Sequence, residues 1–387
     1  MKLNFTQLLS AFSLALDLGE SKVLSHAKRT GYIAFRIGEK LGFSDTLDLF
    51  HGGLIHDIGV TKTLSEEHFI SERIKNHCLF GRELAENLPI TKNVKDIVSY
   101  HHEHFDGTGP NGLKGMEIPI EAQIVFMADQ LDIRINHYQN IYNQKSQLID
   151  FIKENANTLF NGEIVQAFLD LAKRDKFWLD LQYNNFQYVF RNLQQDKYKY
   201  LAIEELLDIS RLFARIIDSK SKFTYRHSTG LADLMKLVGE KNSFSYQDIL
   251  KLKIASLLHD IGKLGVPREI LEKPGRLTDE EFNTIKSHVY FTKHILSQVE
   301  GLEEINQIAG NHHEKLDGSG YAEGLTSEQL SYYDRILALG DIYQALTEER
   351  PYRKGDDPEK ALTKLKVLVE QGLLCSEGFD SLRRAVI

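Results

Sequence analysis

The sequence predicts an all-α fold in which one helical unit occurs twice. Three observations support this prediction: a histidine- and aspartate-containing pattern repeats at a nearly constant separation, apolar residues recur at helical spacing, and alternating strand patterns and hairpin dipeptides are lacking. At 387 residues the chain also exceeds the usual size of a single hydrophobic core. We therefore expect two domains, each of somewhat under about 200 residues.

The repeat is defined by five pairs of matched residues. The letters "HDIG" begin at His56 and again at His259, and the match extends well beyond them. The pairs are separated by 201, 203, 211, 211 and 212 positions: His26 with His227, His56 with His259, His77 with His288, His101 with His312, and Asp129 with Asp341. The neighbouring residues His102 and His313 match as well, so ten of the fifteen histidines lie at matched positions, and a shared chemical role explains them better than packing does.

The N-terminal segment is predicted to be the first helix of the repeat. Its residues "NFTQLLSAFSLALDLGES" match the later "AIEELLDISRLFARIIDS". Lys2 ahead of an apolar run resembles a signal peptide, but Gln7 and Ser10 interrupt the run and no Ala-x-Ala cleavage site follows. We therefore expect no export and a cytoplasmic location.

The residues that define the repeat fall on predicted helices. One helix is indicated by apolar residues at spacings of three and four, with a capping signal at Ser245 and Asp248: Leu250, Ile254, Leu257, Leu258 and Ile261. A second carries a similar stripe: Ile336, Leu339, Ile342 and Leu346. Thr278 and Glu281 form a capping box that opens the helix with His288. These patterns predict two helical bundles.

The domain boundaries follow from the repeat. "NGEIVQAFLDLA" near residue 161 resembles the end of the chain, "EGFDSLRRAVI", so the first domain is predicted to span 1–175 and the second 201–387. Residues 176–200 between them are rich in aromatics and lack Pro and Gly. A flexible linker would be rich in Gly and Ser, so we expect a helical bridge.

Composition excludes several classes of protein. The formal charge of −8 and the pI near 6.0, without a long cluster of Lys and Arg, argue against duplex nucleic acid as a partner, and no membrane partner is expected. Cys78 and Cys375 are too few for a disulfide framework and too far apart for a CxxC motif. A small anionic substrate stays compatible with the acidic background, because metal ions and a few basic side chains can attract it locally.

The matched residues are of the types that bind transition metals. The adjacent residues His259 and Asp260, and likewise His312 and His313, project about 100° apart on a helix, so each pair can hold one metal from two directions or reach two metals. Imidazole and carboxylate together suit Fe, Mn or Zn. Seven ligands exceed what one tetrahedral ion needs. They indicate two metals roughly 3.5 to 4 Å apart, which generate a hydroxide at neutral pH and hold a phosphoester.

From about residue 205 onwards the chain resembles an HD-GYP domain of the HD phosphohydrolase superfamily. The motifs are "HDIGKLGVPREILEKPGRLTDEE", "HHEKLDGSGYAEGL", "GDIYQALTEERPYR" and "FTYRHS". The resemblance implies a phosphodiesterase with two metal ions, Fe or Mn in the first place and Zn, Ni or Co as alternatives. The implied metal ligands are His227, His259, Asp260, His288, His312, His313 and Asp341, with Asp260 bridging the metals and counted, with Lys263, as catalytic. The implied substrate contacts are Lys263, Gly320, Tyr321, Arg350 and Arg353.

Three positions depart from the family pattern. Phe223 stands where some members carry a glutamate ligand for a third metal, which favours a binuclear site. The signature loop reads Gly320-Tyr321-Ala322 in place of Gly-Tyr-Pro. Gln344 replaces an aspartate common in its helix, which leaves Asp341 as the sole carboxylate there.

The first domain resembles a degenerate HD domain. It keeps the metal-type residues: His26, His56, Asp57, His77, His101, His102 and Asp129. Val60, Tyr138 and Ile141 stand where the second domain has Lys263, Arg350 and Arg353, and the interval from His56 to His77 is 21 residues against 29 for His259 to His288. Because a lysine at such a position can neutralise a developing phosphate charge and a valine cannot, the first domain is expected to lack this catalysis.

The resemblance implies bacterial cyclic-dinucleotide signalling. The expected reaction is hydrolysis of a 3'-5' cyclic dinucleotide, 3',3'-cGAMP or cyclic di-GMP, to the linear 5'-phosphorylated dinucleotide. A degenerate HD unit ahead of an HD-GYP unit favours the hybrid dinucleotide. Two alternatives are an HD phosphohydrolase acting on nucleoside phosphates and a non-catalytic metal-containing binding or scaffold protein. Four questions stay open: which dinucleotide is preferred, which metal is native, whether the first domain binds metal, and whether the chain forms a homodimer.

Overall fold

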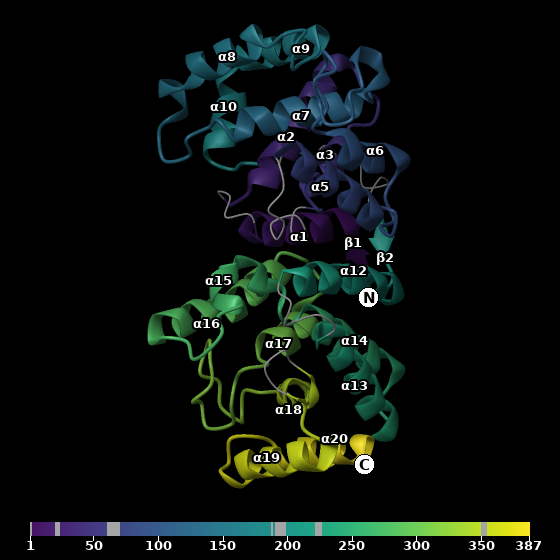
Figure 1. Cartoon of the computed structure of the whole chain (residues 1–387), viewed down its shortest axis with the longest axis vertical. Coiled ribbons are helices and arrows are strands. Elements are labelled where there is room, and N and C mark those ends of the chain that lie inside the picture. Colours follow the sequence, from purple (N-terminus) through teal and green to yellow (C-terminus); the bar gives the residue numbers. More distant parts are fainter. Residues whose placement is uncertain are drawn as a thin grey trace. The chain divides into compact units, whose positions relative to one another are not determined.

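The computed structural model describes residues 2–19, 24–59, 70–186, 189, 199–220, 227–349 and 354–387. They form two compact units: a first unit of Phe12–Lys199, and a second unit of Met1–Ala11 with Tyr200–Ile387. Nearly all their secondary structure is helical, so the predicted all-α class is confirmed (Figure 1). Helix α1 (Phe5–Gly19) gives its first residues to the second unit and the rest to the first unit.

The first unit is a bundle of helices joined mostly by short connections. Its elements after α1 are α2 (His26–Leu41), α3 (Leu47–Ile55), α5 (Ile70–Ala85), α6 (Lys92–Tyr100), η1 (Gly115–Glu117), α7 (Ile120–Asp132), η2 (Ile141–Asn143), α8 (Lys145–Glu154), α9 (Gly162–Ala172) and α10 (Asp175–Gln182). Helix α2 packs against α3, α7 and α9 and so runs through the middle of the bundle. Of the expected bridge 176–200, the structure describes α10, which packs on α9, and a few residues beyond it.

The second unit repeats this plan. Its elements are β1 (Leu3–Asn4), β2 (Tyr200–Leu201), α12 (Ile203–Ser219), α13 (His227–Lys241), α14 (Tyr246–Leu258), η4 (Ile261–Gly265), α15 (Arg268–Leu271), α16 (Asp279–Leu296), α17 (Glu303–Gly310), α18 (Tyr332–Thr347), α19 (Pro358–Glu370) and α20 (Ser376–Val386). Helix α14 is its central helix, since it packs against α12, α13, α17 and α18.

One short antiparallel ladder joins β1 and β2, with Leu3 opposite Leu201 and Asn4 opposite Tyr200. The sequence predicts no strand. Two residues per strand are too few to produce a visible alternation of apolar and polar residues, so sequence pattern cannot reveal such a ladder.

The predicted helix starts are confirmed in the second unit. The Ser245 hydroxyl accepts a hydrogen bond from the Asp248 backbone N–H at 3.1 Å and begins α14. Thr278 and Glu281 form the reciprocal capping box that begins α16. The predicted apolar stripe is buried throughout, but its last residue, Ile261, lies in η4 and not in α14. In α18, Ile336 and Leu339 are buried, whereas Ile342 and Leu346 are only half-buried.

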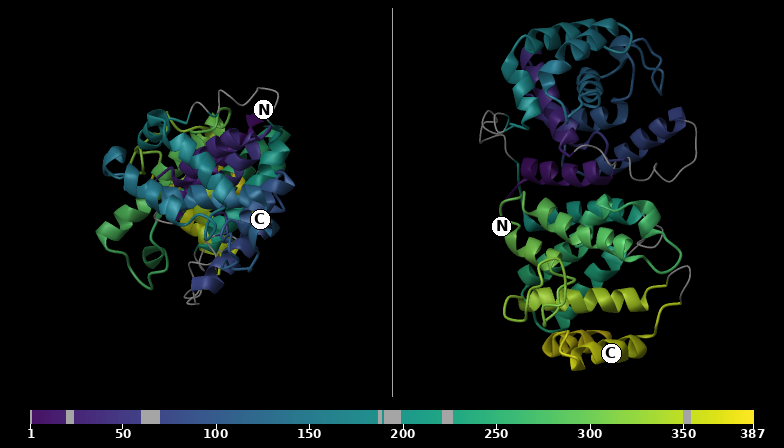
Figure 2. Two further views of the ribbon diagram at one scale, coloured as in Figure 1. Left: turned by 90° about the horizontal axis from the view of Figure 1, so that it is seen from above. Right: turned by 90° about the vertical axis from the view of Figure 1, so that its left-hand side faces the viewer.

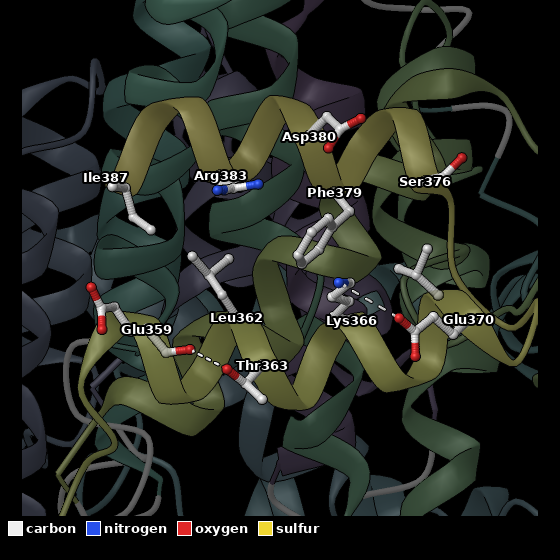
Figure 3. Close-up of a pocket in the computed structure, with 11 residues that line it drawn as sticks. Glu359, Leu362, Thr363, Lys366, Glu370, Ser376, Phe379, Asp380, Arg383 and Ile387 are labelled. Atoms are coloured by element: carbon white, nitrogen blue, oxygen red, sulfur yellow. Dashed lines mark hydrogen bonds and ion pairs between the residues drawn. The ribbon is translucent and has the colours of Figure 1, made fainter.

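The last two helices form a pair of their own. Helices α19 and α20, at the yellow end of the chain, lie side by side in both Figure 1 and Figure 2. A surface groove runs between them, lined by Leu362 and Phe379 together with charged side chains such as Lys366 and Arg383 (Figure 3). None of the repeat-matched histidines or aspartates lines this groove. Within the described residues no helix is both long and apolar enough to span a membrane.

Candidate metal centre and active site

The seven residues expected to bind metal in the second unit lie around one point. They come from the start of α13, the end of α14, the middle of α16, the turn after α17 and the second half of α18. Three groups have their ligand atoms within 4.8 Å of one another: His227, His259 and Asp341; His259, Asp260 and His312; and His288, His312 and His313. His259 and His312 are shared between groups, so the seven residues form one continuous cluster, the second-unit cluster.

Asp260 lies at the centre of the second-unit cluster. Its Oδ2 is 3.1 Å from Nε2 of His259, and its Oδ1 is 3.4 Å from Nε2 of His288 and 3.9 Å from Nε2 of His312. The side chain is almost fully buried, and among the described residues Oδ1 has no hydrogen-bond partner. A buried carboxylate oxygen without a donor is costly, and a bound cation would satisfy it.

The imidazoles turn their Nε2 atoms towards the centre of the cluster. The other ring nitrogen, Nδ1, lies within hydrogen-bond distance of a backbone carbonyl at His259 (Ser256 O, 2.7 Å), His288 (Ile285 O, 2.6 Å) and His312 (Ala309 O, 2.7 Å). A carbonyl only accepts, so each Nδ1 carries the proton and each Nε2 presents a lone pair. Nε2 of His288 and Nε2 of His312 are 3.3 Å apart. Two lone pairs at that distance repel each other unless a cation binds them, so the donor set fits a metal.

The protonation states also suit metal ligation. Burial lowers the pKa of His288 to about 3 and holds the pKa of His312 well below its usual range. Burial works against the charge of Asp260, but His259 and Lys263 outweigh it and lower the pKa of that carboxyl. His288 and His312 therefore offer neutral imidazoles and Asp260 a charged carboxylate, the forms that bind Fe, Mn or Zn.

Glu348, at the end of α18, supports the cluster and was missed by sequence reasoning. Nδ1 of His227 lies 3.2 Å from Oε2 of Glu348, while its Nε2 lies 3.0 Å from Oδ1 of Asp341. Burial would lower the pKa of His227, but these two carboxylates raise it to about 10. Glu348 directly follows the last residue of α18 and contacts the outer nitrogen of His227, so Asp341 stays the carboxylate that this helix is predicted to supply to the cluster. Glu348 follows Asp341 by two helical turns, a spacing that could have indicated it.

We expect Glu348→Gln to weaken metal binding by roughly 10- to 100-fold, the usual effect of removing a carboxylate that orients a ligating histidine. The amide keeps the size of the side chain but cannot hold the charge that raises the pKa of His227. Titrating activity against Mn²⁺ measures the change, and excess metal should restore turnover. Glu349→Gln, a neighbouring exposed glutamate, is the matched control. Identical Mn²⁺ curves for Glu348→Gln and the unmodified chain would contradict the prediction.

Lys263 adjoins the second-unit cluster. It lies in η4, directly after the His-Asp pair, and its Nζ is 2.5 Å from Oδ2 of Asp260. The side chain keeps about a fifth of its surface exposed, unlike the buried carboxylate beside it. The structure therefore places the ammonium at the edge of the cluster, between buried ligands and solvent.

The signature loop lies against the histidine pair. The ring of Tyr321 is 4.8 Å from the ring of His313, centroid to centroid. A side chain on Gly320 would collide with the backbone of His313 and Glu314, so only glycine fits this approach. Buried Glu314 accepts hydrogen bonds from three backbone N–H groups further along the loop, 323–325. Sequence reasoning missed this anchoring role.

Several predicted residues lie outside the described part of the chain. Arg350 and Arg353, expected to contact substrate phosphate, fall within 350–353. Phe223, the residue at the third-metal position, falls within 221–226. Their expected roles stay predictions of the sequence. Gln344 is described, and its side-chain amide lies close to the backbone of Gly230 on α13.

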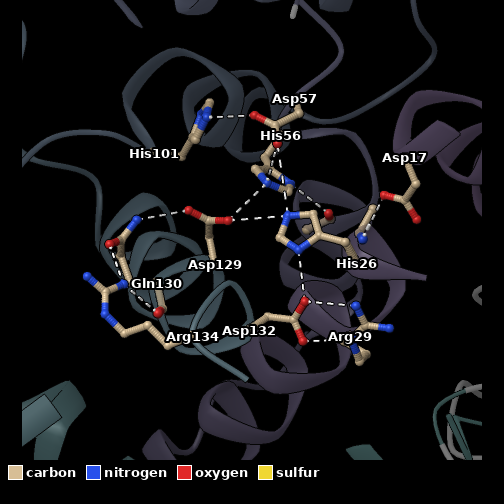
Figure 4. A network of polar contacts seen from close by, with 12 residues as sticks. Asp17, His26, Arg29, His56, Asp57, His101, Asp129, Gln130, Asp132 and Arg134 are labelled. Atoms are coloured by element: carbon tan, nitrogen blue, oxygen red, sulfur yellow. Dashed lines mark hydrogen bonds and ion pairs between the residues drawn. The ribbon is translucent and has the colours of Figure 1, made fainter. Parts of the chain in front are cut away.

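The first unit holds a matching cluster (Figure 4). Two groups have their ligand atoms within 4.8 Å of one another: Asp57, His77, His101 and His102; and His26, His56 and Asp57. Asp57 takes the central position, with Oδ1 3.1 Å from Nε2 of His77 and Oδ2 3.0 Å from Nε2 of His56. Asp129 Oδ1 lies 3.3 Å from Nε2 of His26. All seven metal-type residues are thus brought together here as well.

A buried arginine distinguishes the first-unit cluster. Nδ1 of His26 is 2.8 Å from Oδ2 of Asp132, and Arg29 donates to both oxygens of the same carboxylate, at 2.7 and 3.1 Å (Figure 4). Asp132 thus takes the place that Glu348 has in the second unit. Arg29 neutralises this carboxylate, which weakens its pull on His26. Sequence reasoning missed both residues.

The first unit has no basic side chains at two of the described positions that match the phosphate contacts. Tyr138 is 92% exposed and Ile141 is buried in the core. The valine at position 60 lies outside the described residues. The two clusters therefore share their metal-type residues and differ in what surrounds them.

Known proteins resemble this chain, one of them over nearly its whole length and another over part of it. Two family models, each described as an HD domain, match residues 23–134 and 211–371. The 3'3'-cGAMP-specific phosphodiesterase 1 of Vibrio cholerae is 30% identical over 98% of this chain and 91% of that protein. The cyclic di-GMP phosphodiesterase PA4108 of Pseudomonas aeruginosa is 36% identical over 38% of this chain and 36% of that protein.

A solved structure extends the likeness to the fold. The crystal structure of V-cGAP3, a cyclic GMP-AMP-specific phosphodiesterase of Vibrio cholerae, matches with a TM-score of 0.73 and 25% identity, covering 100% of this chain and 98% of that one. Given this fold, two HD-domain matches and 30% identity over nearly the full length of a relative, the chain belongs to the HD-domain phosphodiesterases of the HD-GYP type.

Proposed function

We propose that this chain hydrolyses a 3'-5' phosphodiester bond of a cyclic dinucleotide, preferentially 3',3'-cGAMP, and releases the linear 5'-phosphorylated dinucleotide. One observation carries the choice of substrate. The similarity to the 3'3'-cGAMP-specific phosphodiesterase covers 98% of this chain, whereas the similarity to the cyclic di-GMP phosphodiesterase covers 38%. Only the first similarity is long enough to include both units.

The proposed reaction centre is the second-unit cluster with two transition-metal ions, Fe or Mn in the first place and Zn, Ni or Co as alternatives. The ligands would be His227, His259, Asp260, His288, His312, His313 and Asp341, with Asp260 between the two metals. The overlap of the three ligand groups supports two ions, because one ion cannot use all seven donors. Such ions, when bound, activate water and neutralise phosphate charge.

The chain's own residues would hold and polarise the substrate. Lys263 is proposed to face a phosphate oxygen: once cations balance the charge of Asp260, its ammonium is available to the substrate. Burial raises the pKa of Tyr321, and the nearby charges of Asp260 and Asp341 add to this effect, so its phenol is a neutral hydrogen-bond donor beside the cluster. Arg350 and Arg353 are proposed as further phosphate contacts on the family resemblance alone.

Product analysis tests the proposed reaction. In oxygen-18 water with Mn²⁺ or Fe²⁺, we expect 3',3'-cGAMP to give a linear dinucleotide with one label in its 5'-phosphate, because water attacks phosphorus and the 3' oxygen leaves. Cyclic di-GMP, run in parallel, should be cleaved more slowly. Label at the 3' side would contradict the proposed chemistry. Activity on nucleoside phosphates alone would favour a general HD phosphohydrolase. A lack of activity on both cyclic dinucleotides and nucleoside phosphates would favour a binding or scaffold protein.

The net charge, the cysteines and the first-unit cluster support three further proposals. The acidic net charge supports the absence of a duplex nucleic acid partner. Both cysteines are free and buried, which supports a reducing, cytoplasmic location. We propose that the first unit binds metal without cleaving the substrate, since it keeps the ligands and lacks the described phosphate contacts. A homodimer stays a prediction of the family resemblance.

A further inference from the structure

A row of side chains leads away from the second-unit cluster along α16. The ring of Tyr321 contacts His313 of the cluster on one side and the ring of Phe282 on the other, 6.2 Å away and nearly perpendicular at 82°. One turn further along the helix, Nζ of Lys286 lies 5.3 Å from the centre of the Phe282 ring. The metal-type residues are thus continuous with an aromatic ring and a cation.

The core does not account for Phe282. The residue is 46% exposed, whereas the buried face of α16 is made by other residues, among them Val289 and Ile295. Within the described part of the chain, no carboxylate pairs with Lys286. An exposed aromatic ring next to a cation with no described carboxylate partner, joined to the metal-type cluster through Tyr321, is the arrangement expected of a ligand contact.

The first unit supplies an internal comparison. Its helix α5 matches α16 through His77 and His288, and it has Ser71 and Lys75 at the positions of Phe282 and Lys286. Pro110 stands where the second unit has Tyr321. The unit folds around the same metal-type cluster without either ring, so the fold does not require them. The rings occur only in the unit that also carries Lys263.

We propose that Phe282 and Lys286 form a base-binding subsite that selects guanine in the substrate. This inference rests on the proposed cyclic-dinucleotide hydrolysis and extends it. Phe282 would stack on a nucleobase, as aromatic side chains do in single-strand binding proteins. Lys286 would donate to O6 and N7 of guanine, whereas adenine presents a donor, N6, where guanine presents O6. One guanine of the substrate would lie here while its adjoining phosphate reaches the cluster.

Steady-state kinetics with 3',3'-cGAMP, cyclic di-GMP and cyclic di-AMP tests the subsite. We expect Phe282→Ala to lower kcat/KM roughly 10- to 100-fold for every substrate, through lost stacking, and Phe282→Trp to restore most of it. Lys286→Met should reduce the preference for cyclic di-GMP over cyclic di-AMP by roughly tenfold or more. Metal content should stay unchanged in all three variants. Tyr290→Ala, which removes another exposed ring of α16, is the control and should match the unmodified chain.

The outcomes separate the subsite from the reaction. If the unmodified chain cleaves none of the three dinucleotides, the proposed function fails. If it cleaves them and Phe282→Ala behaves like Tyr290→Ala, the function stands and the subsite is refuted. A Lys286→Met variant that loses activity equally on guanine and adenine substrates would refute base selection. A loss of bound metal in Phe282→Ala would assign the ring a structural role instead.

Discussion

Replacing Asp260 with asparagine is expected to abolish turnover, with a loss on the order of 10⁴-fold or more. A metal centre contributes several kcal/mol to phosphoester hydrolysis, and each 1.4 kcal/mol or so corresponds to a factor of ten. Asp260 is the residue on which this centre depends, since its two oxygens lie close to His259, His288 and His312. The amide keeps the shape of the side chain but supplies neither the charge nor the second anionic oxygen.

Metal analysis separates this loss from misfolding. The Asp260→Asn variant should keep the helical circular dichroism of the unmodified chain, because Asp260 follows α14 and is not part of a helix core. It should lose most of the metal held by the second unit. Asp57→Asn, at the matched position of the first unit, is the control and should lose metal there while cleavage continues. Full metal content with no turnover would refute the ligand role, and persistent turnover would refute the site.

The repeat explains why most of the cluster could be predicted. Matching two copies of one pattern identified the same seven residue types in each unit. Both copies fold into the same bundle, so the seven side chains meet at equivalent places in the two units. Helix starts at Ser245 and Thr278 were predictable because capping is local, depending on residues three positions apart. The repeated metal-type residues and the locally determined helix caps can therefore be inferred from the sequence.

The supporting residues could not be predicted in this way, because their partners are distant and differ between the units. Arg29 meets Asp132 across 103 positions, and Glu348 meets His227 across 121. The repeat match assigns Gln344 to the position of Asp132, so the match does not identify Glu348, the carboxylate that contacts His227 in the second unit. Phe282 was missed for another reason: the exposure of a phenylalanine is known only once the helix face is known.

The two units differ electrostatically around equivalent histidines. In the first unit, the carboxylate behind His26 is shared with a buried guanidinium, while in the second unit no such cation is described beside the carboxylate behind His227. A carboxylate without a competing cation makes the imidazole a more basic metal ligand. Among the described residues, the second unit thus combines a carboxylate without a competing cation with the side chains proposed to bind substrate, which supports the proposal that catalysis is confined to it.

Lys263→Ala is expected to lower turnover roughly 10²- to 10³-fold. This is the usual effect of removing one preorganised charged donor that stabilises the charge developing on the phosphate. The ammonium lies at the partly exposed edge of the cluster, so its loss should leave metal content little changed. Lys263→Arg should keep part of the activity because it keeps the charge. The contact with Asp260 offers a competing explanation, in which Lys263 only positions that carboxylate.

Metal content decides between the two explanations: a positioning role predicts that metal and turnover fall together in Lys263→Ala, while a substrate role predicts that turnover falls alone.

The matching change in the first unit completes the experiment. His56→Ala with Asp57→Ala should leave dinucleotide cleavage largely intact, and Val60→Lys should create no second activity, because Tyr138 and Ile141 still replace both arginines. If the folded His56/Asp57 double variant loses cleavage as completely as Asp260→Asn, then the first cluster takes part in catalysis. In that case the lysine after one "HDIG" motif and the valine after the other do not mark a catalytic and a non-catalytic unit.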